Sequence, residues 1–228
     1  MAYDLEEQEQ IANFKAFWDR FGNLIMWVLI IALLGFAGYN YWKSRERNQA
    51  AEASALYDSL VNAIQANAAA PGAAPAPADA AKVQRIAGDI ESKFGSTAYG
   101  QMAALGAAKA AFDASDLKTA KAQLQWAIDH GNDEYKSVAR LRLSGVLLDE
   151  KAYDQALALL NGEFLPQFAA QVADRKGDVL SAQNKLPEAR AAYEPALAQM
   201  SKNHPGRQLV QLKLDAIGGA AAEAKKAA

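Results

Sequence analysis

Apolar residues form one uninterrupted run near the N-terminus, with no charged side chain between Arg20 and Lys43. A helix over residues 21–42 would be about 33 Å long at about 1.5 Å per residue, enough to cross a hydrocarbon layer of about 30 Å. Aromatic side chains suited to the two membrane interfaces stand near its ends: Trp18, Phe21, Tyr39, Tyr41 and Trp42. The pattern predicts a single membrane-spanning helix over residues 21–42.

Residues 1–20 begin with acidic side chains and then place Ile11, Phe14 and Phe17 at three-residue intervals. This spacing predicts an amphipathic helix, which either lies at the membrane interface or docks a partner. Because the leader is acidic and lacks a basic start, we expect the span to be a retained anchor rather than a cleaved signal. Basic residues on the two flanks nearly balance. They slightly favour a cytoplasmic location for the C-terminal side, although long domains override this bias.

Three segments with different patterns follow the span. Residues 43–67 are polar and alanine-rich with an apolar face, which predicts a connecting helix. Residues 68–78 hold three prolines and a glycine without any charge, which predicts an Ala/Pro-rich linker. Residues 79–228 show helical periods and no alternating β pattern, so we expect an all-α domain.

The helical domain contains an internal repeat at offsets of 36 and 33 residues, which is typical of helix-turn-helix repeats. Each copy has a small residue, an alanine twelve positions later and a larger residue after four more. Small residues on two helices allow close approach, and the larger one fills the remaining gap. The predicted packing residues are Ala108, Ala120, Leu124, Ser144, Ala156, Leu160, Gly177, Ala189 and Tyr193.

These small and bulky positions resemble the tetratricopeptide repeat over about residues 101–200. The repeats are degenerate, because the usual tryptophan is absent from their fourth positions and Pro195 is expected to bend the second helix of the third repeat. Asn161 and Gly162 predict an early end for the second helix of the middle repeat. The fold class expected is therefore all-α, with one N-terminal transmembrane helix followed by a tetratricopeptide-like α-solenoid of about three degenerate repeats.

The same resemblance implies a concave groove lined by the first helix of each repeat. The alternative is that the apolar members of this set belong to the core between neighbouring repeats. Carried over position by position, the nine candidate groove residues are Met102, Leu105, Lys109, Phe112, Val138, Leu141, Leu148, Gln171 and Asp178. The other positions carried over are Asp113, Gly145, Asp149, Asp174, Ser181 and Ala182.

Composition argues against most kinds of chemistry. The chain of 228 residues has no cysteine and two histidines, far apart in the sequence, so we expect no metal site and no cofactor. Its 24 basic and 26 acidic residues give a net charge of −2, which argues against nucleic-acid binding. Phosphate-binding and nucleophile motifs are absent from the sequence, so we expect no catalytic residues and no enzyme activity.

The N-terminal region is more specific than the repeats. The acidic EEQEQI opening, the aromatic KAFWDRFGN lead-in and the single span together resemble the ancillary subunit family of the SecYEG translocon. The resemblance implies a bacterial inner-membrane protein with a cytoplasmic N-terminus and a periplasmic repeat domain. It also implies partners: the SecYEG translocon, a PpiD-type membrane-anchored chaperone and a cytoplasmic stress-response regulator that contacts the tail.

Two functions from different classes remain open. The first is a non-catalytic interaction protein that helps pass exported proteins from the translocon to periplasmic chaperones. The alternative is an envelope scaffold that tethers division or cell-wall machinery through the same repeats. The proteins that co-purify with the chain would separate the two.

Overall fold

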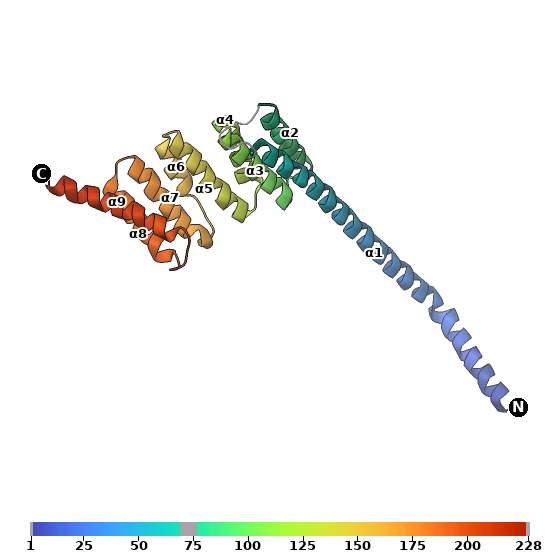
Figure 1. The fold of residues 1–228 in the computed structure, drawn as a ribbon. Coiled ribbons are helices and arrows are strands. Elements are labelled where there is room, and N and C mark those ends of the chain that lie inside the picture. Colours follow the sequence, from blue (N-terminus) through green and yellow to red (C-terminus); the bar gives the residue numbers. More distant parts are fainter. Residues whose placement is uncertain (1, 69–76, 227–228) are drawn as a thin grey trace. The chain divides into compact units, whose positions relative to one another are not determined.

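The structure is a computed structural model, and it describes residues 2–68 and 77–226. Every regular element in these residues is helical (Figure 1), which confirms the all-α prediction. The chain divides into two compact units, the first ending at Glu52 and the second beginning at Ala53. Each unit is described by itself.

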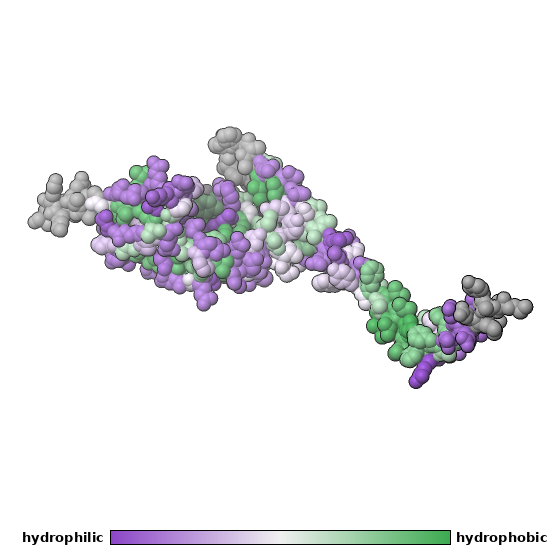
Figure 2. Space-filling view, turned by 90° about the horizontal axis from the view of Figure 1, so that it is seen from below, coloured by the Kyte–Doolittle hydropathy of each residue, from purple (hydrophilic) through white to green (hydrophobic). Residues whose placement is uncertain are grey.

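The first unit consists of the N-terminal part of α1, which runs over Ala2–Ala68. Figure 2 shows a continuous hydrophobic band on this helix, with hydrophilic residues to either side. Within the described part of the chain, α1 is the one helix that is long and apolar enough to cross a membrane. The large apolar side chains of this band, such as Leu24, Ile31 and Leu34, are exposed, as lipid-facing residues would be.

The second unit consists of the end of α1 and the helices that follow it. Figure 1 shows α3 to α8 as successive helix pairs, in which α3, α5 and α7 are the first helices of the three repeats. The elements are α2 (Pro77–Phe94), α3 (Ala98–Asp113), α4 (Leu117–His130), α5 (Asp133–Asp149), α6 (Tyr153–Leu160), η1 (Pro166–Phe168), α7 (Ala169–Ala182), α8 (Leu186–Gln199) and α9 (Arg207–Lys226).

The core of this unit extends beyond the repeats at both ends. Before them, Leu60 of α1 and Ile90 of α2 are completely buried in one cluster with α3. After them, Val210 of α9 is buried in a cluster with α8. The end of α1 and α2 thus cover one end of the repeat stack and α9 covers the other, as solenoids require.

The helix boundaries agree with the sequence at some positions and differ at others. α6 ends at Leu160, as predicted from the Asn-Gly pair that follows it. α2 begins at Pro77, inside the predicted linker, which is consistent with the preference of proline for the first helical turn. α8 is continuous through Pro195. Of the predicted linker, residues 69–76 lie outside the described residues.

Candidate interaction groove

The turns between the paired helices are the same in all three repeats. Ser115, Lys151 and Asn184 occupy equivalent positions and have positive φ angles of 61°, 60° and 59°. In each turn this residue donates a backbone hydrogen bond to the carbonyl three residues before it, and the next residue donates to the carbonyl five before it. These repeated bonds close the ends of α3, α5 and α7 and set the start of the helix that follows.

The residues that the repeat pattern assigned to packing are buried. All nine lie inside the unit: Ala108, Ala120, Leu124, Ser144, Ala156, Leu160, Gly177, Ala189 and Tyr193. In the third repeat the two helices approach closely, because a Cβ atom on Gly177 would lie 2.4 Å from the ring of Tyr193. The close pairing of the two helices within a repeat determines which side of the first helix faces the first helix of the next repeat.

The nine candidate groove residues differ in how far they are exposed to solvent. Leu105 is buried, and Met102, Val138, Leu141, Leu148 and Asp178 are partly buried. Val138, Leu141 and Leu148 pack against the central core cluster, which supports the alternative that the apolar members serve the core. Lys109, Phe112 and Gln171 are exposed and accessible to a partner.

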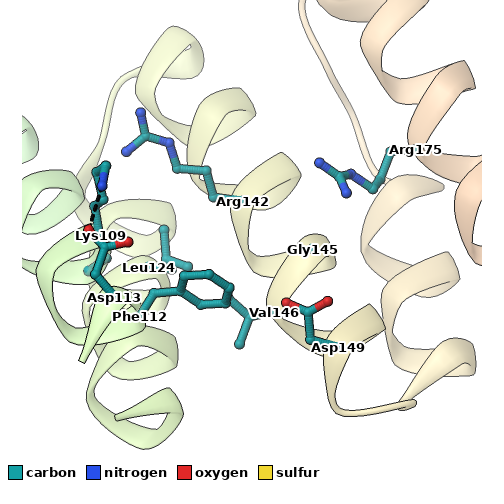
Figure 3. A pocket seen from close by; sticks show the side chains of 10 residues that line it. Lys109, Phe112, Asp113, Leu124, Arg142, Gly145, Val146, Asp149 and Arg175 are labelled. Carbon is teal, nitrogen blue, oxygen red and sulfur yellow. Dashed lines mark hydrogen bonds and ion pairs between the residues drawn. The ribbon is translucent and has the colours of Figure 1, made fainter. Parts of the chain in front are cut away.

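An open pocket of about 460 Å³ lies on the first helices α3, α5 and α7, with Leu124 of α4 at its base (Figure 3). It brings together Lys109 and Phe112 of the predicted set. Asp113, Gly145 and Asp149, from the other positions carried over, line it as well, and the remaining predicted groove residues do not. Its lining is Ala108, Lys109, Phe112, Asp113, Leu124, Arg142, Gly145, Val146, Asp149 and Arg175.

Two arginines in this pocket were missed by the sequence reasoning. Arg142 and Arg175 hold the sixth position of the second and third repeats, which was not among the positions carried over. The recurrence of arginine at the repeat offset was the signal that could have found them. Gly106 occupies this position in the first repeat, so the basic side chains come from α5 and α7 only.

The remaining charges of the pocket are acidic or paired. Lys109 forms an ion pair with Asp113 one turn later on α3. Asp149 ends α5 at the other side of the pocket. Arg175 in turn lies 3.7 Å from Asp178 on the same helix. Among the described residues, the pocket therefore combines an apolar base with the guanidinium groups of Arg142 and Arg175 and the carboxylate of Asp149.

A polar network beside the pocket joins α7, α8 and α9. Lys213 Nζ lies 2.8 Å from Asp174 Oδ1 and 2.7 Å from Asp178 Oδ1, and the Tyr193 hydroxyl donates to Asp178 Oδ1 at 2.8 Å. Burial, with a further contribution from Asp178, raises the pKa of Tyr193 well above its usual range, so this hydroxyl stays a donor. Burial also raises the pKa of Asp174. Asp178 is thus held in a structural contact instead of facing the groove freely.

The structure supplies no arrangement for metal binding in the residues it describes. Within residues 2–68 and 77–226, no group of three or more His, Cys, Asp or Glu side chains could hold a metal ion. His130 ends α4, where its Nδ1 atom lies 3.0 Å from the Trp126 carbonyl and its ring stacks on Trp126. These contacts are structural and stabilise the end of the helix.

The candidate membrane-interface residues form two groups on α1. Trp18 and Phe21 precede the apolar band, and Tyr39, Tyr41 and Trp42 end it; all five side chains are exposed. Trp18 stacks on Phe14 one turn earlier, with ring centroids 6.2 Å apart. Exposed aromatic rings at both ends of an apolar band are typical of interfacial anchoring.

Comparisons with known proteins cover both the anchor and the repeats. A family model described as a tetratricopeptide repeat-like domain matches residues 15–219. The chain is 35% identical over 218 residues to the ancillary SecYEG translocon subunit of Neisseria gonorrhoeae, covering 95% of this chain and 100% of that one. It is 32% identical to the same-named protein of Haemophilus influenzae, over 94% of this chain and 99% of the relative. It is 30% identical to the same-named protein of Escherichia coli K12, over 85% of this chain and 92% of the relative. The chain therefore belongs to the tetratricopeptide repeat-like family that includes the ancillary SecYEG translocon subunits.

Proposed function

We propose that the chain is a non-catalytic interaction protein that is anchored in the bacterial inner membrane and associates with the SecYEG translocon. The observation that carries this proposal is the match to relatives bearing that name along nearly the whole of both chains. A match restricted to the repeats would indicate an interaction domain without identifying its partner, because proteins with many unrelated functions share this fold. Here the anchor matches as well.

The finer role we propose is that the repeat domain helps pass exported proteins from the translocon to periplasmic chaperones. A PpiD-type membrane-anchored chaperone would be its neighbour in this task. The open pocket on α3, α5 and α7 supports the proposal because it offers a place for a segment of a partner protein. The exposed aromatic face of the tail, with Phe14 and Phe17, would serve a cytoplasmic stress-response regulator.

This role requires the N-terminus in the cytoplasm and the repeat domain in the periplasm. The orientation is testable because the chain has no cysteine. Gln10→Cys in the tail and Ser201→Cys after α8 each place a single thiol at an exposed position. We expect a membrane-impermeant maleimide to label the Ser201→Cys chain in cells with an intact inner membrane, and to label the Gln10→Cys chain only after lysis.

Denatured samples of both variants control for thiols that are buried rather than shielded by the membrane. The reverse pattern would place the repeats in the cytoplasm. That result would contradict a role in receiving exported proteins, since these reach the chaperones on the periplasmic side. A cytoplasmic adaptor would then be the better interpretation.

A further inference from the structure

We propose that the groove between α6 and α8 binds an α-helix of a partner protein, which packs apolar side chains on α7 and pairs one acidic side chain with Lys176. This α6–α8 groove shares no lining residue with the pocket on α3, α5 and α7. The inference rests on the proposed function in one respect: the repeat domain must bind proteins. It adds a second docking surface and the kind of segment that fits it.

The groove exists because α6 is shorter than the second helices on either side of it. α6 covers eight residues, whereas α4 and α8 cover 14 residues each. The six residues by which α6 falls short correspond to about 9 Å of helix at about 1.5 Å per residue. A stretch of the layer of second helices is therefore missing where α6 ends, next to the start of α7.

A pocket of about 550 Å³ occupies this place, bounded by the end of α6, the segment that follows it, α7 and α8. α7 contributes one face of its helix, at intervals of three and four residues: Ala169, Val172, Ala173 and Lys176. α8 contributes two further alanines, Ala191 and Ala192. Small side chains on both helices leave room for a third helix to approach closely.

Lys176 is the only charged residue among those described that line the groove. Its side chain is partly buried, and its ammonium has no ion pair or hydrogen bond with any other residue in the described part of the chain. A cation in apolar surroundings is stabilised by a paired anion. The groove therefore favours a ligand that brings one negative charge.

The preceding repeats use the same position for packing. Leu143 lies 33 residues before Lys176 and is 6% exposed, and Ala107 of the first repeat is completely buried. Leu143 lines the equivalent groove between α4 and α6, where the charged lining residue Lys121 is already paired with Glu150 at 2.7 Å. Of these two grooves, only the one between α6 and α8 offers a cation without a partner among the described residues.

A helix is the segment that fits this groove, because it would take the place of the turns that α6 lacks. Apolar residues at intervals of three and four on a partner helix form a ridge that can pack into the groove beside α7. An acidic residue on the same face, one turn from an apolar one, would then reach Lys176. A basic residue there would be repelled, so the charge of Lys176 also sets specificity.

The test measures binding of labelled helical peptides to the full chain in nonionic detergent micelles by fluorescence anisotropy. The first peptide is acetyl-Aib-Gln-Aib-Leu-Gln-Aib-Leu-Glu-Aib-Gln-Leu-Aib-Gln amide, in which Aib is the helix-favouring α-aminoisobutyrate. It places its leucines and its glutamate on one face. Two further peptides carry glutamine or lysine instead of the glutamate. We expect the glutamate peptide to bind about tenfold more tightly than the glutamine peptide, because hydrogen bonds to charged groups exceed those to neutral ones.

Charge variants of Lys176 test the pairing. Lys176→Gln should make the glutamate and glutamine peptides bind equally, and Lys176→Glu should reverse the preference in favour of the lysine peptide. Lys118→Gln, at an exposed lysine on α4, is the control and should change nothing. All chains share the same micelles, so peptide that partitions into detergent contributes equally to each measurement.

Two tryptophan variants test the place of binding. Ala191→Trp should weaken all three peptides, because the added ring fills the groove at an exposed position. Ala158→Trp is the matched control, since Ala158 is the exposed equivalent of Ala191 in the groove between α4 and α6. It should leave the affinities unchanged. An equal effect of the two substitutions would place the peptides elsewhere and overturn the inference.

Lys176→Leu separates binding from stability, because it installs the residue of the second repeat. It should abolish the preference for glutamate and raise the midpoint of urea unfolding. A lowered midpoint would show that Lys176 stabilises the fold and would contradict its assignment to a ligand. Equal binding of the glutamate and glutamine peptides to the unaltered chain would overturn the inference without the use of any variant.

Sedimentation velocity without peptide tests the other possible occupant, a second copy of the chain. Self-association that Lys176→Gln abolishes would assign the groove to that copy and overturn the inference. None of these results bears on the association with the translocon, which is measured separately by recovery of SecYEG subunits. Loss of that recovery while the preference for glutamate persists would contradict the proposed function alone.

Discussion

Gly177 shows how a single residue determines the packing of a repeat. Its missing side chain lets Tyr193 of α8 lie against the α7 backbone, where a Cβ atom would come within 2.4 to 2.7 Å of three ring atoms. The ring has no freedom to move away, because its hydroxyl donates to Asp178 at 2.8 Å and the residue is 2% exposed. Glycine is required here for close approach and not for an unusual backbone conformation.

We predict that Gly177→Ala destabilises the repeat domain by about 1–3 kcal/mol, the usual cost of overpacking a filled core. Gly145→Ala is the matched control on the preceding first helix. Its Cβ atom would meet Arg175 at an ordinary contact distance of 3.6 Å, so the helix preference of alanine should make the change neutral or stabilising by up to about 1 kcal/mol. Urea unfolding followed by circular dichroism measures both. Equal effects of the two substitutions would contradict the packing described for Tyr193.

Asp116 stabilises the start of α4 by capping it. Its carboxylate accepts a hydrogen bond from the Thr119 backbone N–H at 3.0 Å, and hydrogen bonds from the Thr119 side chain and backbone hold the pKa of Asp116 below its ordinary value of 3.8. Since the folded-state pKa is the lower one, the added stability is present above 3.8 and is lost as the pH falls through the folded-state value.

We therefore expect Asp116→Ala to lower the free energy of unfolding by about 1 kcal/mol at neutral pH. Asp116→Asn keeps a capping oxygen but does not titrate, so the advantage of the native chain over this variant should shrink on acidification toward pH 3. Thermal unfolding across this pH range is the measurement. A difference that stays constant, or grows as the pH falls, would contradict the sign of the pKa shift.

At the level of elements, α9 is held to the last repeat by one lysine between two carboxylates. Lys213 contacts Asp174 and Asp178 of α7, and its ammonium also lies 5.7 Å from the centre of the Tyr193 ring. All three charged side chains are no more than a quarter exposed, so water screens the contacts weakly. α9 in turn covers the apolar side of α8 that would otherwise end the stack exposed.

Lys213→Met should loosen α9, because it leaves the two aspartates of α7 half-buried without their shared cation. We expect a loss of about 1–3 kcal/mol, with faster amide exchange confined to α8 and α9. Lys202→Met, in the exposed turn before α9, removes the same charge without these contacts and serves as the control. Hydrogen–deuterium exchange measured by mass spectrometry resolves the two. Unchanged exchange in α9 of Lys213→Met would show that apolar packing alone holds this helix.

Packing within a repeat was predictable from the sequence, whereas contacts between repeats were not. Ala120 and Leu124 meet the first helix of their own repeat, so their positions follow from local helix geometry and short turns. Arg175 reaches the pocket because α7 lies beside α5, where its guanidinium passes over Gly145. That juxtaposition depends on how successive repeats stack, which the periodicity of one repeat does not encode. The burial of Leu105 follows the alternative in which the apolar groove candidates belong to the core between neighbouring repeats.

At the level of the whole molecule, an exposed apolar helix and a helical repeat domain occur in one chain. The first has the length and composition of a membrane anchor. The second presents an open pocket lined by basic side chains and an exposed aromatic ring. A chain of this kind keeps an interaction surface at the membrane, which is the property that an accessory protein of a membrane channel needs. The relatives over nearly its full length bear the name of such a protein.

Association with the translocon is the central claim, and co-purification from native membranes tests it most directly. The full chain, tagged at its C-terminus, would be cross-linked in cells, extracted in mild detergent and isolated, with an unrelated single-span protein at equal abundance as control. If the chain associates with the translocon, we expect SecYEG subunits to be recovered well above this control. Recovery no greater than the control, or recovery of division or cell-wall proteins in their place, would contradict it.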